Sequence, residues 1–409
     1  MKEGHGPGLR ILVTSDVHLG MKFSAYPEAQ HELSEARFQC LDRIVDRANR
    51  ERCDMIVIAG DLFDRLKTPK EQIVRAASSL NGFEGELVAV LPGNHDYATG
   101  GRGSLWGAFT DAAGDRVLVL TEGRPYDLAH YDLDVRLFPG PCHEKHSKDN
   151  ALAWLDGAQP AAPIPLRIAV AHGSVEGLSY DSEGVYYPLK RAWMEAAGMD
   201  LWIVGHSHTP HSSGPCDPLP LYVPGCPEPD GFDCSHEGRV WLLDIGRDRR
   251  VSAVSLVTGA HRFVTAELTV PAGGGGETGR TPAAVTPDPQ RSLRSAIEAA
   301  LALETPLDEP SSDAWGRTLA RITLRGRLPR EDRKRLEERI AALESSLLLA
   351  RIDDTGVAEE ITPELVDIEF TQGSFPHRLL HTLLQLDDDA AVRMAYDLLQ
   401  EAGPQEAGP

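Results

Sequence analysis

The chain has 409 residues and a formal net charge of −21, because 41 Lys and Arg stand against 62 Asp and Glu. This length exceeds what one hydrophobic core usually serves, so it predicts two domains. A hydrophobic fraction of 41% and a charged fraction of 25% are typical of a globular protein. The acidic balance argues against a protein that coats nucleic acid through bulk charge, although an enzyme with a local basic surface stays compatible with it.

Targeting segments and cysteines give few positive signals. No apolar run approaches the roughly 18 residues of a membrane span, and residues 1–9 lack the apolar region of a signal peptide. We therefore expect a cytoplasmic protein without a membrane partner. The six cysteines are Cys40, Cys53, Cys142, Cys216, Cys226 and Cys234. Since they contain no Cys-x-x-Cys pair, they argue against a zinc knuckle or a secreted disulfide framework, and we expect reduced thiols without a role.

Strands and helices alternate in the first part of the chain. Short apolar runs predict buried strands over 9–14, 55–59, 87–91, 166–171 and 201–204. The polar stretch 21–36 predicts a loop, and apolar residues at helical spacing predict helices over 38–51 and 71–80. This alternation implies an α/β fold in which helices cover a parallel sheet.

The first three strands each end in residues suited to polar chemistry. Asp16 and His18 follow the first strand, and residues two apart in extended backbone point to the same side. Asp61 follows the second strand, and Asn94 and His95 follow the third in a Gly-Asn-His-Asp turn. Each motif alone is more often a surface coincidence or an ordinary turn. However, ligands of parallel sheets bind beyond the carboxyl ends of the strands, where all these residues fall.

The last two predicted strands also end in histidines, at the same carboxyl end. His172 ends one strand, and His206 and His208 follow the other. A lone histidine is more often a structural residue, but two imidazoles on one side of a strand end indicate a metal. The candidate metal ligands are therefore Asp16, His18, Asp61, Asn94, His172, His206 and His208.

This ligand set is large enough for two cations that share one carboxylate, and we select Asp61 as the shared ligand. Two metals about 3.5–4 Å apart activate a water and hold the attacking and leaving oxygens of a phosphoryl displacement. Oxygen and nitrogen ligands without thiolate favour manganese, iron or zinc over copper(I) or iron–sulfur clusters. We expect Mn²⁺, with iron or Zn²⁺ as alternatives.

In their order along the chain, Asp-x-His, Gly-Asp, Gly-Asn-His-Asp, the histidine motif and Gly-His-x-His resemble the calcineurin-like metallophosphoesterases. The resemblance covers residues 10 to about 210, with Ala171 where the family often has Gly. It implies a sandwich of β-sheets flanked by helices. It also implies one metal at Asp16, His18, Asp61 and His208, and another at Asp61, Asn94, His172 and His206. His95 would be the catalytic acid that faces the phosphate.

Within this family the chain is most similar to SbcD and its YhaO-like bacterial relatives, nuclease subunits that process DNA ends with an SMC-like coiled-coil ATPase. The motif Gly60-Asp61-Leu62-Phe63-Asp64 and the order of domains carry this resemblance. It implies a DNA exonuclease or endonuclease that acts on DNA ends or single strands, with the ATPase as partner and a homodimer as a further assembly. Many SbcD proteins have His at the position of Asp64, so we expect Asp64 to orient His95, with a loop or helix-capping role as the alternative.

Two other functions stay open. Gly60-Asp61-x-x-Asp64-Arg65 partly resembles the phosphoprotein phosphatases, although Leu66 stands where they have Gly and Asp96 where they have Glu. The chain would then be a phosphatase or phosphodiesterase of small or protein phosphoesters. A non-catalytic scaffold would require ligands to be missing, and none is.

The remaining chain predicts an edge hairpin, a linker and a second domain. Runs over 240–245 and 251–257 flank a turn and predict the hairpin. A Gly- and Pro-rich segment predicts a flexible linker over 271–290, between a nuclease domain over 1–270 and a smaller α+β domain over 291–409. Its predicted elements are helices over 292–303 and 330–348, strands over 318–324 and 366–370, and a helical pair over 375–399.

The second domain concentrates positive charge and apolar surface. Its basic residues are Arg317, Arg321, Arg325, Arg327, Arg330, Arg333, Lys334, Arg335 and Arg339. Phosphate contact and a salt-bridged helix both explain them. The segment 376–399 carries more apolar residues than a terminal helical pair usually buries, so we expect this domain to bind DNA or a partner's coiled coil.

Overall fold

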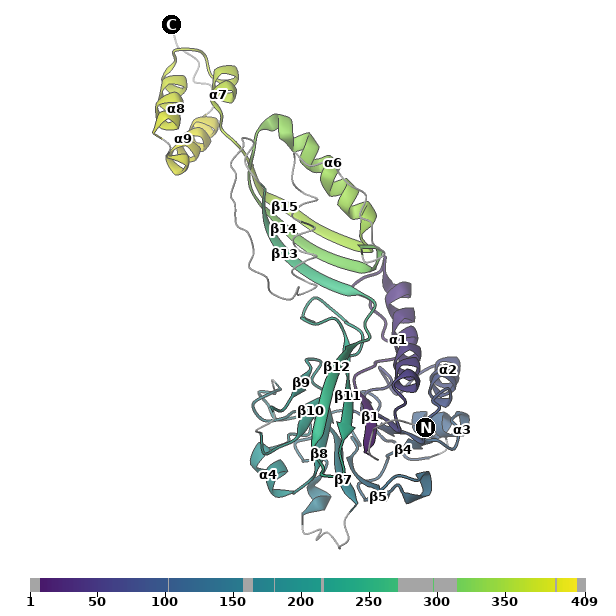
Figure 1. Cartoon of the computed structure of the whole chain (residues 1–409). Helices are drawn as coiled ribbons and strands as arrows, with labels where there is room; N and C mark the ends of the chain where they lie inside the picture. The colour runs from purple at the N-terminus through teal and green to yellow at the C-terminus, as the bar shows by residue number, and fades with distance from the viewer. Residues whose placement is uncertain are drawn as a thin grey trace, which may run out of the picture. The chain divides into compact units, whose positions relative to one another are not determined.

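The computed structural model describes residues 8–101, 103–156, 165–179, 181–214, 217–270, 297, 315–386 and 388–402. The chain divides into two compact units, residues 1–263 and 264–409. The strand over 262–270 pairs with strands of the second unit (Figure 1), so that unit begins before the linker that we expect over 271–290. The linker itself lies outside the described residues.

The first unit has two six-stranded sheets. The first sheet runs in the order β12-β11-β1-β2-β3-β4, with β1 (Leu9–Thr14), β2 (Met55–Ala59), β3 (Leu87–Leu91), β4 (Val117–Val119), β11 (Arg239–Ile245) and β12 (Val251–Val257). Strands β1 to β4 are parallel, and β11 and β12 form an antiparallel pair at one edge. The three predicted strands of this sheet and its edge hairpin are confirmed.

The second sheet runs in the order β5-β6-β7-β8-β10-β9. Its strands are β5 (Tyr126–Asp127), β6 (Val135–Gly140), β7 (Leu166–His172), β8 (Leu201–Gly205), β9 (His211–Ser212) and β10 (Leu221–Val223). Strands β6, β7, β8 and β10 are parallel. The two strands that end in candidate histidines therefore belong to a different sheet from the strands that end in Asp16, Asp61 and Asn94.

Apolar side chains join the two sheets into a sandwich. Ile11 and Val57 from the first sheet share one buried cluster with Leu137, Val170 and Ile203 from the second. Because the central strands are covered on both faces, their sequences are nearly continuous apolar runs rather than alternating ones. The fold class is therefore the predicted α/β sandwich of sheets flanked by helices.

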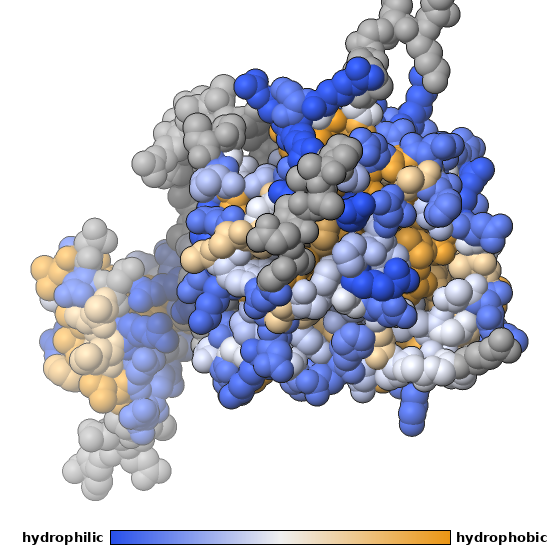
Figure 2. Space-filling model, turned by 90° about the horizontal axis from the view of Figure 1, so that it is seen from below, coloured by the Kyte–Doolittle hydropathy of each residue, from blue (hydrophilic) through white to orange (hydrophobic). Residues whose placement is uncertain are grey.

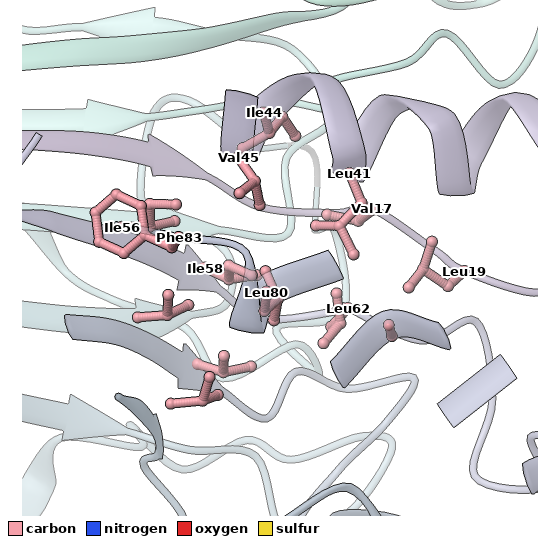
Figure 3. Close-up of a cluster of buried hydrophobic side chains, with 14 of the residues drawn as sticks. Val17, Leu19, Leu41, Ile44, Val45, Ile56, Ile58, Leu62, Leu80 and Phe83 are labelled. Atoms are coloured by element: carbon pink, nitrogen blue, oxygen red, sulfur yellow. The ribbon is translucent and has the colours of Figure 1, made fainter. Parts of the chain in front are cut away.

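Helices cover the outer faces of both sheets. Helices α1 (Gln30–Arg50), α2 (Lys70–Asn81) and α3 (Leu105–Ala112) contribute to the cluster on the first sheet, and α4 (Arg191–Ala196) contributes to the cluster on the second. Figure 3 shows Ile44 and Val45 of α1 beside Ile56 of β2 in this packing. Helix α1 begins at Gln30, inside the predicted loop 21–36, because Leu33 and Ala36 extend its buried stripe. Short 3₁₀ turns lie at Ala129–Tyr131, Ala153–Leu155 and Trp315–Arg317.

The described part of the second unit contains a three-stranded sheet, a helix that connects two of its strands, and three helices that follow the sheet. The strands are β13 (Arg262–Val270), β14 (Thr318–Leu328) and β15 (Leu349–Glu359), and α6 (Arg330–Ser346) connects the parallel pair β14 and β15. Helices α7 (Pro363–Glu369), α8 (Phe375–Gln385) and α9 (Asp389–Ala402) follow. Among the described residues, no helix is both long and apolar enough to cross a membrane.

The predictions for this unit were mixed. The strand over 318–324, the helix over 330–348 and the helical pair are confirmed. The predicted strand over 366–370 is wrong, because Thr362 caps helix α7 by accepting from the Leu365 N–H, and a proline occupies its first turn. Strand β15 was missed because most of its side chains are polar or exposed. The helix predicted over 292–303 lies outside the described residues, apart from Ile297.

Substitution of Phe109 tests the packing of α3. Its fully buried ring lies edge-on to Phe63 and Trp106, with centroids 5.8 and 5.6 Å away. We expect Phe109→Ala to lower the free energy of unfolding of the first unit by about 3–5 kcal/mol in urea denaturation. Val74→Ala, at a side chain that is 46% exposed on α2, is the control and should change it by less than about 0.5 kcal/mol. Equal midpoints for the two variants would contradict this packing.

Candidate metal centre

The seven candidate ligands converge where the carboxyl ends of the two sheets meet. Asp16 and His18 follow β1, Asp61 follows β2 and Asn94 follows β3, while His172 ends β7 and His206 and His208 follow β8. The first sheet thus supplies three oxygen ligands and one imidazole, and the second sheet supplies three imidazoles. The centre depends on how the sandwich pairs the two sheets.

One group of ligands surrounds the ring nitrogens of His18 and His208. Their Nε2 atoms are 3.3 Å apart. The Nε2 of His18 is 3.7 Å from Oδ2 of Asp61, and the Nε2 of His208 is 3.8 Å from Oδ1 of Asp16. The structure therefore brings together the four residues expected to hold the first metal.

The second group surrounds Asn94. Its Oδ1 is 3.0 Å from Nε2 of His172 and 3.2 Å from Nδ1 of His206. The Nε2 of His172 is also 3.3 Å from Oδ2 of Asp61. The same Asp61 oxygen thus faces both groups, as expected of the shared ligand.

Buried polar atoms show that the arrangement suits cations. Asp16, His18, Asp61, Asn94 and His172 are each at most 2% exposed. Oδ1 of Asp16 is buried without a hydrogen-bond partner, which is costly unless another group satisfies it. Two divalent cations, held by oxygen and nitrogen ligands, would meet this need, so the residues fit the dinuclear centre that the sequence predicts.

The pKa values of three candidate histidine ligands indicate which rings carry a proton at neutral pH. Burial lowers the pKa of His172, but the charge of Asp61 outweighs it and raises the pKa to about 9. Burial likewise lowers the pKa of His208, and the hydrogen bond to Asp230 raises it to about 9. Burial holds the pKa of His18 well below its ordinary value. A proton on His208 can therefore be donated to the neutral His18 ring, at the place where a cation would bind both nitrogens.

The backbone of the site is locally strained. Asp16, His18, Asp61 and His206 have positive φ angles of 53°, 48°, 55° and 91°, a region that residues with a side chain seldom adopt. Gly60 has a φ of +94°, and a Cβ there would lie 2.0 Å from Nδ1 of His172. A Cβ on Gly93 would lie 2.1 Å from Oδ1 of Asp61. The glycines of the motifs therefore allow the strand ends to approach closely.

His95 lies at the edge of this centre. Its backbone N–H donates to Oδ1 of Asp61 at 2.9 Å, and its ring is edge-on to His18, with centroids 4.9 Å apart. Nδ1 of His95 is 3.2 Å from the backbone carbonyl oxygen of Asp64, whereas we expected the carboxylate as the acceptor. The Asp64 carboxylate instead lies 3.8 Å from Nδ1 of His18 and 3.3 Å from Arg65.

Sequence reasoning missed two residues behind the centre. Oδ2 of Asp230 lies 2.7 Å from Nδ1 of His208, so the carboxylate orients the ring and leaves Nε2 for a metal. The fully buried Arg37 donates to the Val17 carbonyl at 3.1 Å and lies 3.8 Å from Asp230. No motif connects Asp230 or Arg37 to the strand ends, so a single sequence carries no signal for them.

Asp230 gives a direct test of ring orientation. Asp230→Asn should weaken Mn²⁺ binding about 10- to 100-fold, because His208 loses the charged acceptor that fixes its tautomer. Asp233→Asn, at an exposed residue of the same loop, is the control and should bind as the parent does. Isothermal titration with Mn²⁺ measures both, and equal affinities would remove Asp230 from the centre.

The raised pKa values predict how metal binding depends on pH. Below about 9, His172 and His208 carry protons that a cation must displace, so affinity should rise with pH up to about 9. Mn²⁺ titrations at pH 7, in two buffers of different ionisation enthalpy, should give observed enthalpies that differ by the protons released. Identical enthalpies in both buffers would show that these rings are already neutral.

The first part of the chain is similar to known proteins. A family model described as calcineurin-like phosphoesterase matches residues 9–210. An uncharacterized metallophosphoesterase of Bacillus subtilis, YhaO, is 28% identical over 211 residues, which are 49% of this chain and 48% of YhaO. The DNA double-strand break repair protein Mre11 of Methanopyrus kandleri is 24% identical over 236 residues, which are 55% of this chain and 50% of Mre11. The chain thus spans about half the length of these curated relatives.

A solved structure, the calcineurin-like phosphoesterase YfkN from Bacillus subtilis, matches with 14% identity and a TM-score of 0.37, over 62% of this chain and 92% of that one. The family model covers the segments that carry all seven candidate ligands, from Asp16 to His208. The family resemblance of the sequence is thereby confirmed. Residues 9–210 form a calcineurin-like metallophosphoesterase domain.

Proposed function

We propose that the chain is a dinuclear-metal phosphodiesterase that cleaves DNA, with Mn²⁺ as its native metal. Phosphoester hydrolysis is the chemistry of the family that residues 9–210 match. The finer assignment is supported by the similarity to Mre11 of Methanopyrus kandleri, a DNA double-strand break repair protein, which extends over 236 residues. The observation that carries the proposal is the Asp61 carboxylate, whose Oδ2 faces both groups of ligands.

The residues of the centre divide the work of hydrolysis. Asp16, His18, Asp61 and His208 would hold one cation, and Asp61, Asn94, His172 and His206 the other. When bound, the cations would supply a nucleophile from water at neutral pH and stabilise charge on the phosphoryl oxygens. The Asp64 carbonyl fixes Nδ1 of His95, so Nε2 is the atom available to protonate the leaving oxygen. Asp64 would act on His95 through its main chain.

The surface of the second unit favours protein binding over binding of DNA phosphates. Arg325 pairs with Glu267, Arg333 with Asp354 and Arg335 with Asp332, so these cations fit the salt-bridged interpretation. The segment of helices α7 to α9 exposes large apolar side chains on its helices and at the end of α8: Ile368, Phe375, Leu386, Met394 and Leu398. The small, paler body at the left of Figure 2 shows hydrophobic residues on its surface. We propose that a coiled-coil ATPase docks on this apolar surface.

The catalytic role of His95 is tested with His95→Asn. With Mn²⁺, the parent should cleave linear duplex or single-stranded DNA, and the variant should turn over about 10²- to 10⁴-fold more slowly while it binds Mn²⁺ as the parent does. His130→Asn, at an exposed histidine, is the control and should keep full activity. Asp61→Ala should lose both metal and activity. Hydrolysis of a chromogenic phosphodiester without DNA cleavage would favour the alternative of small or protein phosphoester substrates.

The docking surface is tested with Met394→Glu, which places a charge on α9 where the side chain is 68% exposed. The variant should fold and hydrolyse a small phosphodiester as the parent does, because it lies outside the metal centre. It should lose co-elution with the coiled-coil ATPase of the same organism in gel filtration. Arg393→Glu, at the neighbouring exposed position, is the control and should keep the complex. Unchanged co-elution of the Met394→Glu variant with the ATPase would show that the partner does not dock on this surface.

A further inference from the structure

Three side chains outside the dinuclear centre converge on one point. Cys226 follows strand β10, and the chain then loops so that Cys234 and His236 return beside it. The two Sγ atoms are 3.8 Å apart, and Nε2 of His236 lies 3.7 Å from Sγ of Cys226 and 3.4 Å from Sγ of Cys234. Both cysteines are buried and free, so no disulfide accounts for their approach.

These separations are those of a tetrahedral zinc site. With Zn–S bonds of about 2.3 Å and Zn–N bonds of about 2.0 Å, tetrahedral angles place two sulfurs about 3.8 Å apart and a sulfur and a nitrogen about 3.5 Å apart. The observed triangle of 3.8, 3.7 and 3.4 Å therefore leaves room at its centre for one such ion. A Cys₂His set with a fourth position open to water is a known zinc arrangement.

We propose that Cys226, Cys234 and His236 bind a thiolate-seeking divalent cation, zinc in the first place, as a third metal site separate from the dinuclear centre. The two sites differ in chemistry, because the dinuclear centre offers oxygen and nitrogen ligands whereas this one offers two sulfurs. Because the sequence has no Cys-x-x-Cys pair, it predicts cysteines without a role. The loop nevertheless folds back on itself, so Cys226 and Cys234 come together although they are eight residues apart in the sequence.

Binding changes two hydrogen bonds of His236. Its Nδ1 accepts from the Gly238 N–H at 3.0 Å, so Nε2 carries the proton and lies 2.7 Å from the His208 carbonyl oxygen. Zinc at Nε2 moves this proton to Nδ1, so the contact with Gly238 opens. The Cys226 N–H still donates to the His208 carbonyl at 3.1 Å. The site thus stays attached to the residue that carries a ligand of the dinuclear centre.

Cobalt substitution of the full chain separates this site from the dinuclear centre. Co²⁺ bound by thiolates absorbs in the near ultraviolet through sulfur-to-metal charge transfer, whereas Co²⁺ bound by oxygen and nitrogen does not. We expect this band in the cobalt-loaded parent and in Cys53→Ser, a control at another buried cysteine. Cys234→Ser should lose the band, and its zinc content should be one equivalent lower than that of the parent.

The absence of a charge-transfer band in the cobalt-loaded parent would overturn the proposal. Equal zinc content in the parent and a folded Cys234→Ser would do the same. If that variant does not fold, alkylation of the parent in urea at a concentration that transiently opens the fold decides the matter: zinc should protect Cys226 and Cys234 from iodoacetamide, as located by mass spectrometry. Equal alkylation with and without zinc, or a Cys226–Cys234 disulfide in its place, would rule the site out.

Discussion

The candidate metal centre depends on one carboxylate that contacts ligands from both sheets. Asp61 comes from the first sheet, yet its Oδ2 lies 3.3 Å from His172 of the second sheet and 3.7 Å from His18 of its own. Its Oδ1 accepts the backbone N–H of His95. A shift of one sheet against the other by the length of a single bond would break one of these relations. The tight apolar interface between the sheets is therefore what fixes the chemistry.

Local conformations around the centre are costly, and the fold holds them. Asp16, His18 and Asp61 keep positive φ angles directly after buried strands. Backbone pairing retains them there: the Asp16 N–H donates to the Gly60 carbonyl, and the His18 N–H donates to the Asp61 carbonyl. The carboxylate of Asp96 accepts from the Phe63 and Gly93 N–H groups and joins the second and third strand ends. Strain of this kind persists only where the surrounding structure over-determines it.

Sequence patterns predict the buried strands and the residues at their ends. They do not predict contacts that depend on the path of a long loop. The buried strands are visible as apolar runs, and polar residues at their carboxyl ends locate the candidate ligands, because parallel strands of one sheet bring those ends together. These runs do not show that two sheets meet, which is what places His172 beside Asp61. Asp230 and the Cys226–Cys234–His236 cluster lie in a loop whose route no periodicity encodes. The wrong prediction at α7 has a different cause: Thr362 and Pro363 are helix-start signals, but the apolar residues after them also fit a short strand.

The loop after β10 explains how His208, a partly exposed candidate ligand, is kept in place. The side chain of His208 is 39% exposed, whereas that of His18 is 1% exposed, so packing alone fixes His18 but not His208. The same loop supplies Asp230 to Nδ1 of His208, and both Cys226 and His236 to its backbone carbonyl. These contacts replace the sheet packing that His208 lacks. Because a loop sets the position of His208, the metal that His208 and His18 would hold should exchange more readily than the other, and the loop should set the affinity for that metal.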